Sequence, residues 1–550
     1  MARYHTLLLL AVWSLVLLVI DPRGDFPLND DWAFAHDVKH LVEDGRSVFS
    51  DWPAMTLIAQ TLWGAAFCKV FGFSHEVLRW AVVVLGIGCS LLMYQLAFLL
   101  ANDRRRALFA SLLLMLNPLF LALVVTYMTE VPFLFFTLLS LLSAQRWMAR
   151  ECKLHFVLAC AIGMVAMFVR QHGIVLPLVF GCAFFLRGPK SLPRALAAIA
   201  PFVLAVVMLV LFGRWKATLV PAATQYAPLA SLPAAVLESL DLGLVKRTGL
   251  SLFLIGLPLL PLAIGLGAAS PRRWLVRPAP WAWVVLALAT LCMIATWTRF
   301  PEGLVLYDLG LGAKLLKDTF WGEHFRGQLH PMALAMLRAV VCLGVLYIIG
   351  SVLRRSNDQL APLPTARWFA IIITAIGGAW AGFTLLNTLF FDRYTLILAP
   401  LAILLIIAAT KNRPVRWPVA WALLALLAIP YSLMLRDHFN WSRTRWAALD
   451  HLTGHMGVPP SHIDGGFEFN GWHRPGPRRK TVREGISWWF VADDAYVVAS
   501  GPIQGFAPVD TFTYQRIIPW GTDTILVLQR HDLLRSNGSV GAGAEIQPSP

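Results

Sequence analysis

The chain has 550 residues, of which 58% are hydrophobic and only 14% are charged, and its mean hydropathy is +0.65. Soluble domains carry about 25% charged residues, so this composition excludes an ordinary soluble enzyme and indicates a polytopic membrane protein. The net charge of +15 suggests nucleic acid as a partner. However, the Lys and Arg residues lie in short clusters between apolar runs, which is typical of membrane loops and argues against nucleic acid.

Thirteen apolar runs predict membrane-spanning helices. The first run has the length of a signal peptide, but no small-x-small cleavage pattern follows it, so we interpret it as a retained anchor. The predicted spans cover residues 5–20, 78–101, 107–125, 131–145, 156–169, 174–186, 195–212, 248–269, 279–296, 332–350, 368–389, 394–410 and 418–435.

The distribution of Lys and Arg predicts the orientation of these spans, because cytoplasmic loops are enriched in both. Alternate loops carry three basic residues each, and the loops between them are about three times poorer in Lys and Arg. We therefore expect a cytoplasmic N-terminus, and a tail from residue 436 that lies outside the membrane. The basic loops are 102–106, 146–155, 187–194, 270–278, 351–367 and 411–417.

The outer loop at 21–77 contains an acidic motif, Asn29–Asp30–Asp31–Trp32–Ala33–Phe34–Ala35. The motif opens an amphipathic segment, and a second apolar stretch follows at Met55–Phe71, so two helices are expected along the membrane surface. Asp30 can be an N-cap of the first helix or the centre of a reaction. The orientation also places Glu130, Arg170 and Arg393 on this outer face.

The tail has a different composition and predicts a small α/β domain at 436–535. Trp441–His455 is expected to form a helix, and Ala495–Ser500 and Thr524–Leu528 are expected to form strands. Residues 536–550 are rich in Gly, Ser and Pro, which predicts a disordered end. The predicted fold class is therefore an all-α polytopic membrane domain at 1–435 with a small extracytoplasmic α/β domain.

The acidic motif resembles the first-loop signature of the GT-C glycosyltransferases, in particular their protein-mannosyltransferase and aminoarabinose-transferase branch. Two further segments are similar to motifs of that branch: Thr126–Tyr127–Met128–Thr129–Glu130–Val131–Pro132 and Phe391–Asp392–Arg393–Tyr394. At the position of Glu130 in the first of these segments, members of the family usually have Asp. Glu130 keeps the negative charge. Members of the branch pass a sugar from a polyprenyl-phosphate carrier to an acceptor outside the cytoplasmic membrane. The resemblance therefore implies an inverting transferase with that donor, an extracytoplasmic acceptor and the lipid bilayer as partners. Because the branch includes bacterial members that decorate lipopolysaccharide, the resemblance also implies a location in a bacterial cytoplasmic membrane.

The resemblance implies that Asp30 is the catalytic carboxylate and that Asp31 is the second acid. In such a reaction Asp30 would act as general base, and Asp31 and Glu130 could orient the acceptor or hold Mg²⁺ or Mn²⁺. The alternatives are a helix cap for Asp30, a solvated first-turn acid for Asp31 and an interfacial charge for Glu130.

A departing polyprenyl phosphate needs positive charge, and Arg offers it two parallel donors. The candidates are Arg393, then Arg170, then Arg299 and Lys314. The alternative for each is a cation whose aliphatic stem lies along a helix end while its charge reaches water. Three weaker candidates for substrate contacts are Gln60, His172 and Tyr394.

Two other functions fit a polytopic chain. A transporter or flippase would place ionisable groups near the middle of the bilayer and use paired broken helices. The predicted spans have almost no Asp, Glu or Lys at their centres, and no internal repeat is found. A polysaccharide polymerase or ligase would use the same carrier but a large late loop, whereas the strongest acidic motif here lies in the first loop.

Overall fold

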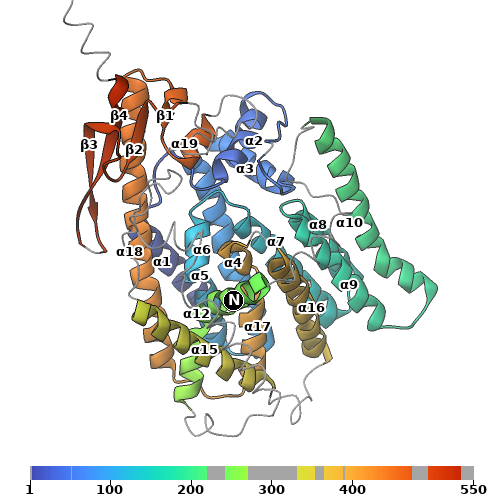
Figure 1. Cartoon of the computed structure of the whole chain (residues 1–550). Coiled ribbons are helices and arrows are strands. Elements are labelled where there is room, and N and C mark those ends of the chain that lie inside the picture. Colours follow the sequence, from blue (N-terminus) through green and yellow to red (C-terminus); the bar gives the residue numbers. More distant parts are fainter. Residues whose placement is uncertain are drawn as a thin grey trace, which may run out of the picture.

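The computed structural model describes residues 3–50, 52–219, 242–269, 331–353, 364–387, 390–473, 493–518 and 520–533. These residues form a helical membrane domain with a small sheet at one end (Figure 1). The helices of the membrane domain are α1 (Arg3–Ile20), α2 (Asp31–Glu43), α3 (Ile58–Phe71), α4 (His75–Ala101), α5 (Arg104–Met115), α6 (Pro118–Val124), α7 (Glu130–Arg150), α8 (Lys153–Met167), α9 (Val175–Leu186), α10 (Leu192–Leu219), α12 (Leu242–Ala268), α15 (Pro331–Leu353), α16 (Pro364–Leu386), α17 (Leu398–Thr410) and α18 (Trp417–Asp450).

The described helices confirm a multi-pass membrane protein. Seven of them are long and apolar enough to cross a bilayer, and four shorter apolar helices accompany them. Together with the pair α5 and α6, they coincide with twelve of the thirteen predicted spans. The remaining predicted span, 279–296, lies outside the described residues.

The predicted span at 107–125 is broken, which corrects the expectation of one straight helix. Helices α5 and α6 meet at an angle of 62°. The Asn117 side chain accepts a hydrogen bond from the Leu119 N–H and so caps α6, and Pro118 occupies its first turn. Proline has no N–H to continue the preceding helix, so this dipeptide ends α5 and starts α6 in a new direction.

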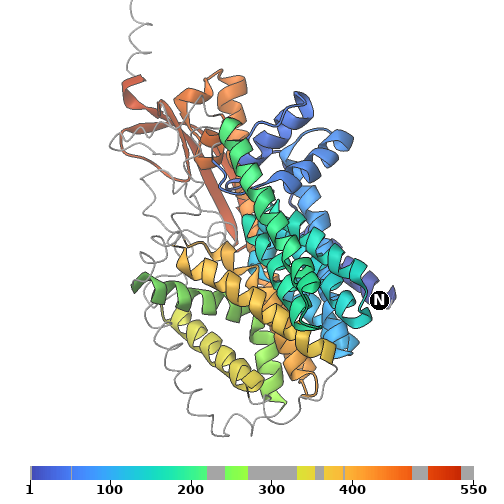
Figure 2. The same cartoon turned by 90° about the vertical axis from the view of Figure 1, so that its right-hand side faces the viewer.

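Helices α2 and α3 lie at the same end of the membrane domain as the sheet (Figures 1 and 2). The loop before α2 is held by the buried guanidinium of Arg79 in α4, which donates to the backbone oxygens of Pro22, Gly24 and Phe26. This clamp attaches the start of the first outer loop to the helix bundle. The two amphipathic helices predicted for residues 21–77 are therefore present as α2 and α3.

The C-terminal part contains β1 (Ile463–Asp464), α19 (Phe467–Trp472), β2 (Tyr496–Ala499), β3 (Phe506–Arg516) and β4 (Gly521–Arg530). The strand order is β1-β2-β4-β3, with β1 and β2 parallel and the other pairs antiparallel. The predicted strands near 495–500 and 524–528 correspond to β2 and β4. Residues 536–550 lie outside the described residues.

Helix α18 runs without interruption through the predicted domain boundary at residue 435. Its Asp437 carboxylate accepts hydrogen bonds from the backbone N–H groups of Ile517 and Ile518, in the turn between β3 and β4. The sheet is thus fixed to the outer part of a helix whose first half belongs to the membrane domain (Figure 2). The helix predicted at Trp441–His455 is the end of α18 together with the π-helical turn η6 (His451–His455).

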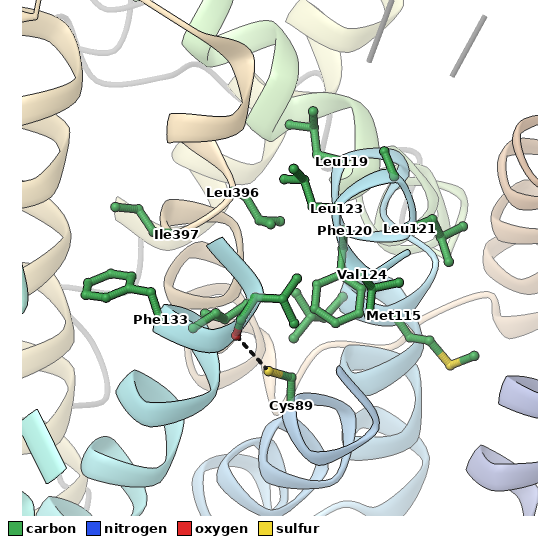
Figure 3. Packing of buried hydrophobic residues seen from close by; sticks show 14 of the residues in the cluster. Cys89, Met115, Leu119, Phe120, Leu121, Leu123, Val124, Phe133, Leu396 and Ile397 are labelled. Atoms are coloured by element: carbon green, nitrogen blue, oxygen red, sulfur yellow. Dashed lines mark hydrogen bonds between the residues drawn. The ribbon is translucent and has the colours of Figure 1, made fainter. Parts of the chain in front are cut away.

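A tightly packed apolar core lies at the junction of α4, α6, α7 and α17. Figure 3 shows Phe120 and Val124 of α6 on one side of this cluster and Phe133 of α7 on the other, with Leu396, just before α17, between them. All four side chains are fully buried. The Cys89 thiol of α4 also donates to the backbone oxygen of Val131 at 3.9 Å. This packing fixes the beginning of α7, which carries Glu130, and the start of α17, which directly follows the turn with Arg393 and Tyr394.

Candidate active site

The Asp30 side chain turns away from the helix that it precedes. Asn29 adopts a left-handed conformation with φ of 60°, which Asn tolerates better than most residues. Asp30 stands at the N-cap position of α2, but its side chain makes no capping hydrogen bond. Instead, Asp30 Oδ1 accepts a hydrogen bond from Trp52 Nε1 at 2.9 Å, and Oδ2 pairs with Arg393 Nη2 at 2.9 Å. The Asp30 carboxylate is therefore held by Trp52 and Arg393 and not by a capping bond to α2, and its catalytic role stays a prediction.

Arg393 joins two carboxylates that are a hundred residues apart in the sequence. It lies in the 3-10 turn η5 (Asp392–Thr395), directly before α17. Its Nη2 contacts Asp30 Oδ2, and its Nε lies 3.5 Å from Glu130 Oε1. The guanidinium is only 5% exposed, so these charges interact with little screening by water. Asp30 and Glu130 thus lie at the same end of the bundle, as the orientation required.

Glu130 is fully buried at the first position of α7. Its Oε1 atom accepts a hydrogen bond from Arg170 Nη1 at 2.7 Å. Its Oε2 atom, like the buried hydroxyl of Thr129, has no hydrogen-bond partner within the described part of the chain. A buried carboxylate oxygen without a partner is costly, so this oxygen is a candidate contact for a bound molecule.

Two acids and two arginines form a cluster of alternating charge, called here the charge cluster: the partly exposed Asp30 and the buried Arg393, Glu130 and Arg170. The Tyr394 ring lies against it, with the Arg170 guanidinium carbon 5.4 Å from the ring centre. A Tyr face attracts a cation, so the ring helps to hold Arg170 in place. Of the predicted residues, the structure therefore brings together Asp30, Glu130, Arg170, Arg393 and Tyr394.

Asp31 is buried beside Asp30 but has different partners. Its Oδ1 accepts from the Leu28 N–H at 2.6 Å, and its Oδ2 accepts from the Tyr127 N–H at 3.0 Å. Burial raises the pKa of the Asp31 carboxyl to about 8, while these two N–H groups and the charge of Arg79 favour the ionised form. Through these two hydrogen bonds, Asp31 connects the first outer loop to the loop before α7. A catalytic role for Asp31 stays a prediction.

The residues present do not fit the cation expected between Asp31 and Glu130. Both Asp31 oxygens accept backbone hydrogen bonds, and Glu130 Oε1 is occupied by Arg170. No group of three metal-ligating side chains occurs among the described residues. A divalent cation requirement stays a prediction, and no step proposed below passes through a metal.

Two weaker candidates that the structure describes, Gln60 and His172, are not part of the charge cluster. The Gln60 amide donates to the Tyr127 backbone oxygen at 2.7 Å, so this residue supports the loop before α7. The His172 ring packs against Phe383, with ring centres 5.1 Å apart. Arg299 and Lys314 lie outside the described residues.

Three residues that touch this region were not predicted from the sequence. Trp52 donates a hydrogen bond to Asp30, and Arg79 donates hydrogen bonds to the backbone of the preceding loop. Glu468 of α19 accepts a hydrogen bond from the Asn29 N–H at 3.2 Å. Glu468 also pairs with Arg445 of α18 at 3.0 Å.

Comparison with known families gives a partial match. Residues 60–215 match the model of the dolichyl-phosphate-mannose-protein mannosyltransferase family. The matched segment contains Glu130 and Arg170, and the match supports the resemblance to this branch of membrane glycosyltransferases. The chain is also 30% identical over 167 residues to an uncharacterized protein of Aquifex aeolicus (strain VF5). That alignment covers 29% of this chain and 33% of the length of the relative.

Several solved structures are similar over most of the chain. ArnT from Cupriavidus metallidurans in the apo state has a TM-score of 0.43 at 14% identity, covering 97% of this chain and 99% of that one. The structure of the same protein bound to undecaprenyl phosphate has a TM-score of 0.40, with the same identity and coverage. The oligosaccharyltransferase AglB from Archaeoglobus fulgidus, in complex with an inhibitory peptide and a dolichol-phosphate, gives 0.42 at 16% identity, covering 88% of this chain and 61% of that one. Likeness at this level assigns no roles to residues.

Proposed function

We propose that the protein is an integral membrane glycosyltransferase that moves a sugar from a polyprenyl-phosphate carrier to an acceptor outside the cytoplasmic membrane. The observation that carries this proposal is the charge cluster, in which Arg393 contacts both Asp30 and Glu130. The matched family is named for transfer of mannose from dolichyl phosphate to protein, which supports a lipid-linked donor of this kind.

Asp30 has the position and exposure that a general base needs. Its carboxylate is 14% exposed, whereas Glu130 is fully buried, so Asp30 is the acid that an acceptor can reach. The acceptor hydroxyl or amine would give its proton to Asp30 while its oxygen or nitrogen attacks the anomeric carbon. The bond from that carbon to the phosphate oxygen breaks in the same step, which inverts the configuration of the sugar.

The departing phosphate becomes a dianion, and the charge cluster supplies the cations that would stabilise it. The two guanidiniums have ten N–H groups between them, and only a few of these are used by Asp30 and Glu130. Arg393 is the first candidate to bind the phosphate, because it also holds the proposed base, and Arg170 is the second. Preorganised donors in a site of low dielectric stabilise developing charge strongly.

The position of the site also suits a donor with a lipid tail. The charge cluster is built from the first residue of α7, the segment after α8 and the turn before α17, all at helix ends. A transporter would need such charges deeper in the bilayer. A polyprenyl tail could remain among the lipids while its phosphate meets Arg393.

The test is to delete the gene and compare envelope lipids, glycans and proteins by mass spectrometry. The deletion strain is then complemented with the wild-type, D30N or D44N chain, and the restored amount of the missing modification is measured. Asp44 is an exposed aspartate at the other end of α2 and serves as a matched control. We expect D44N to restore the modification and D30N to reduce it by roughly 10²- to 10⁴-fold, the usual contribution of a general base.

Two results would contradict the proposal. If D30N restored the modification as well as the wild type at equal protein level, Asp30 would not be the base. If no sugar were lost from any envelope component on deletion, while uptake of a labelled solute into proteoliposomes depended on Asp30, the protein would be a transporter.

A further inference from the structure

A cavity of about 420 Å³ lies at the opposite end of α7 from the charge cluster. One wall comes from α4, with Gln95, Phe98 and Leu99, and the other comes from α7, with Arg146 and Arg150. Positions three and four residues apart share a face of a helix, so each wall is one continuous helix face. The cavity is therefore formed by two rigid elements that pack against each other.

The depth of the cavity follows from the length of α7. This helix has 21 residues, from Glu130 to Arg150. At 1.5 Å per residue it spans roughly 30 Å, which is about the thickness of the hydrocarbon core. Since Glu130 belongs to the charge cluster at one surface, the two arginines lie at the headgroup layer of the other surface.

The walls combine positive charge with apolar surface. Arg146 and Arg150 are exposed, and within the described chain neither forms an ion pair with a carboxylate. Leu99 is 46% exposed, and Phe98 beside it is partly exposed. No Asp or Glu is among the described residues that line the cavity. Such a site suits a ligand with an anionic head and an acyl chain.

We propose that this cavity binds the phosphate headgroup of an anionic phospholipid from the leaflet opposite to the candidate active site. The phosphate would lie between Arg146 and Arg150, which offer bidentate donors. The Gln95 and Gln145 amides could bind the glycerol or headgroup hydroxyls, and the first part of an acyl chain would lie along Phe98 and Leu99. Basic pockets between membrane helices are suited to such headgroups.

The experiment measures lipid binding directly and does not depend on the proposed enzymatic function. The full chain is delipidated in detergent and titrated with phosphatidylglycerol or with phosphatidylcholine, and bound lipid is counted by native mass spectrometry. The variants are R146Q/R150Q, R146K/R150K and the control K153Q/R416Q. The control removes two exposed cations near the same membrane surface that do not line the cavity.

We expect the wild type and K153Q/R416Q to bind one phosphatidylglycerol more tightly than phosphatidylcholine. R146Q/R150Q should bind it on the order of 30-fold more weakly, because each basic side chain at an anionic surface contributes roughly fivefold. R146K/R150K should retain part of the affinity, since it keeps the charge but loses the bidentate geometry.

Three outcomes would overturn the proposal. The first is equal binding of phosphatidylglycerol by R146Q/R150Q and the control. The second is equal affinity of the wild type for phosphatidylcholine, which would remove the role of headgroup charge. The third is complete displacement of the lipid by inorganic phosphate at the same concentration, which would identify a site for a free anion. Sugar transfer by R146Q/R150Q, measured in parallel, reports separately on the proposed function.

Discussion

At the scale of single residues, the charge cluster balances two carboxylates against two guanidiniums in a buried setting. Each ion has given up water, and that cost is offset only while its partners are present. Glu130 depends most on this balance, because it is fully buried and Arg170 provides its shortest contact, at 2.7 Å. The cluster is therefore a sensitive point for folding as well as for activity.

Replacing Arg170 by Gln should separate these two roles. R170Q leaves Glu130 with the more distant Arg393 Nε at 3.5 Å, so we expect a loss of about 3 kcal/mol in the free energy of unfolding. The double variant E130Q/R170Q should regain most of this stability, because no unpaired charge remains buried, but it should stay inactive. Thermal unfolding in one detergent measures the first effect, and sugar transfer measures the second.

K153Q is the control for these variants, because Lys153 is exposed at the far end of the bundle and should leave unfolding unchanged. An unfolding temperature of R170Q equal to that of the wild type would mean that the Glu130–Arg170 pair adds no stability. Recovery of activity in E130Q/R170Q would remove Arg170 and Glu130 from the proposed reaction.

At the scale of elements, the short helix α19 covers α2 closely. A side-chain carbon at Gly471 would lie only 2.4 Å from the Trp32 ring, so glycine is required for this approach. The His36 ring stacks on Trp472 with ring centres 4.1 Å apart. The junction before α19 is held by Asp464 of β1, whose Oδ1 accepts hydrogen bonds from Asn470 and from the Gly466 N–H.

Asp464 should make the stability of this region depend on pH. Burial raises the pKa of its carboxyl to about 6 from the ordinary 3.8. The folded chain then holds a proton that the unfolded chain releases, so this contribution is full below pH 3.8 and is lost as pH rises through about 6. The unfolding temperature of the wild type should therefore fall between pH 4 and 7. We expect this fall to be smaller in D464N, as measured by thermal scans at several pH values.

The comparison with D523N controls for a general effect of removing a buried acid from the same domain. Identical pH profiles for the wild type and D464N would show that the Asp464 carboxyl does not titrate in this range.

The elements were predicted with uneven success for identifiable reasons. Long apolar helices such as α4 and α10 are encoded locally, and hydropathy alone finds them. The break at Asn117–Pro118 also had a local signal, although the length of the apolar run hid it. Strand β3 was missed because Pro508 and Asp510 disfavour strands, and a register shift accommodates them in the structure.

The candidate site was predictable where charge and orientation determine it. Asp30, Glu130, Arg170 and Arg393 all follow from polar residues on one membrane face. The contacts of Trp52 with Asp30 and of Glu468 with Asn29 were not predictable, because they join segments up to 439 residues apart. The hydrogen bonds of Asp31 with the N–H groups of Leu28 and Tyr127 were not predictable either, because backbone N–H groups leave no signal in the sequence.

At the scale of the whole molecule, the structure has two distinct ends. One end carries α2, α3, α19 and the sheet (Figure 1). The other end carries the basic loops that the structure describes throughout, at 102–106, 146–155, 187–194 and 411–417. Asp44 follows α2 at the first end, and Lys153 begins α8 at the second. The predicted orientation places Asp44 outside the cytoplasm and Lys153 inside it.

Single cysteine substitutions should report this orientation. A membrane-impermeant maleimide should label D44C in intact spheroplasts, and it should label K153C only after the membrane is opened. The wild-type chain, with its own cysteines, gives the background labelling. Both positions are exposed, so access to the reagent is limited by the membrane and not by packing. Labelling of K153C in intact spheroplasts would reverse the orientation.

If the protein has the proposed function, the contact between Asp30 and Arg393 has a consequence for the order of events during turnover. In the structure, one oxygen of the Asp30 carboxylate is occupied by the ion pair with Arg393, and the other accepts the hydrogen bond of Trp52. An arriving phosphate would compete for the same guanidinium and loosen that hold. The base would thus become fully reactive only when the carrier is bound, and this dependence would protect the activated sugar from wasteful hydrolysis.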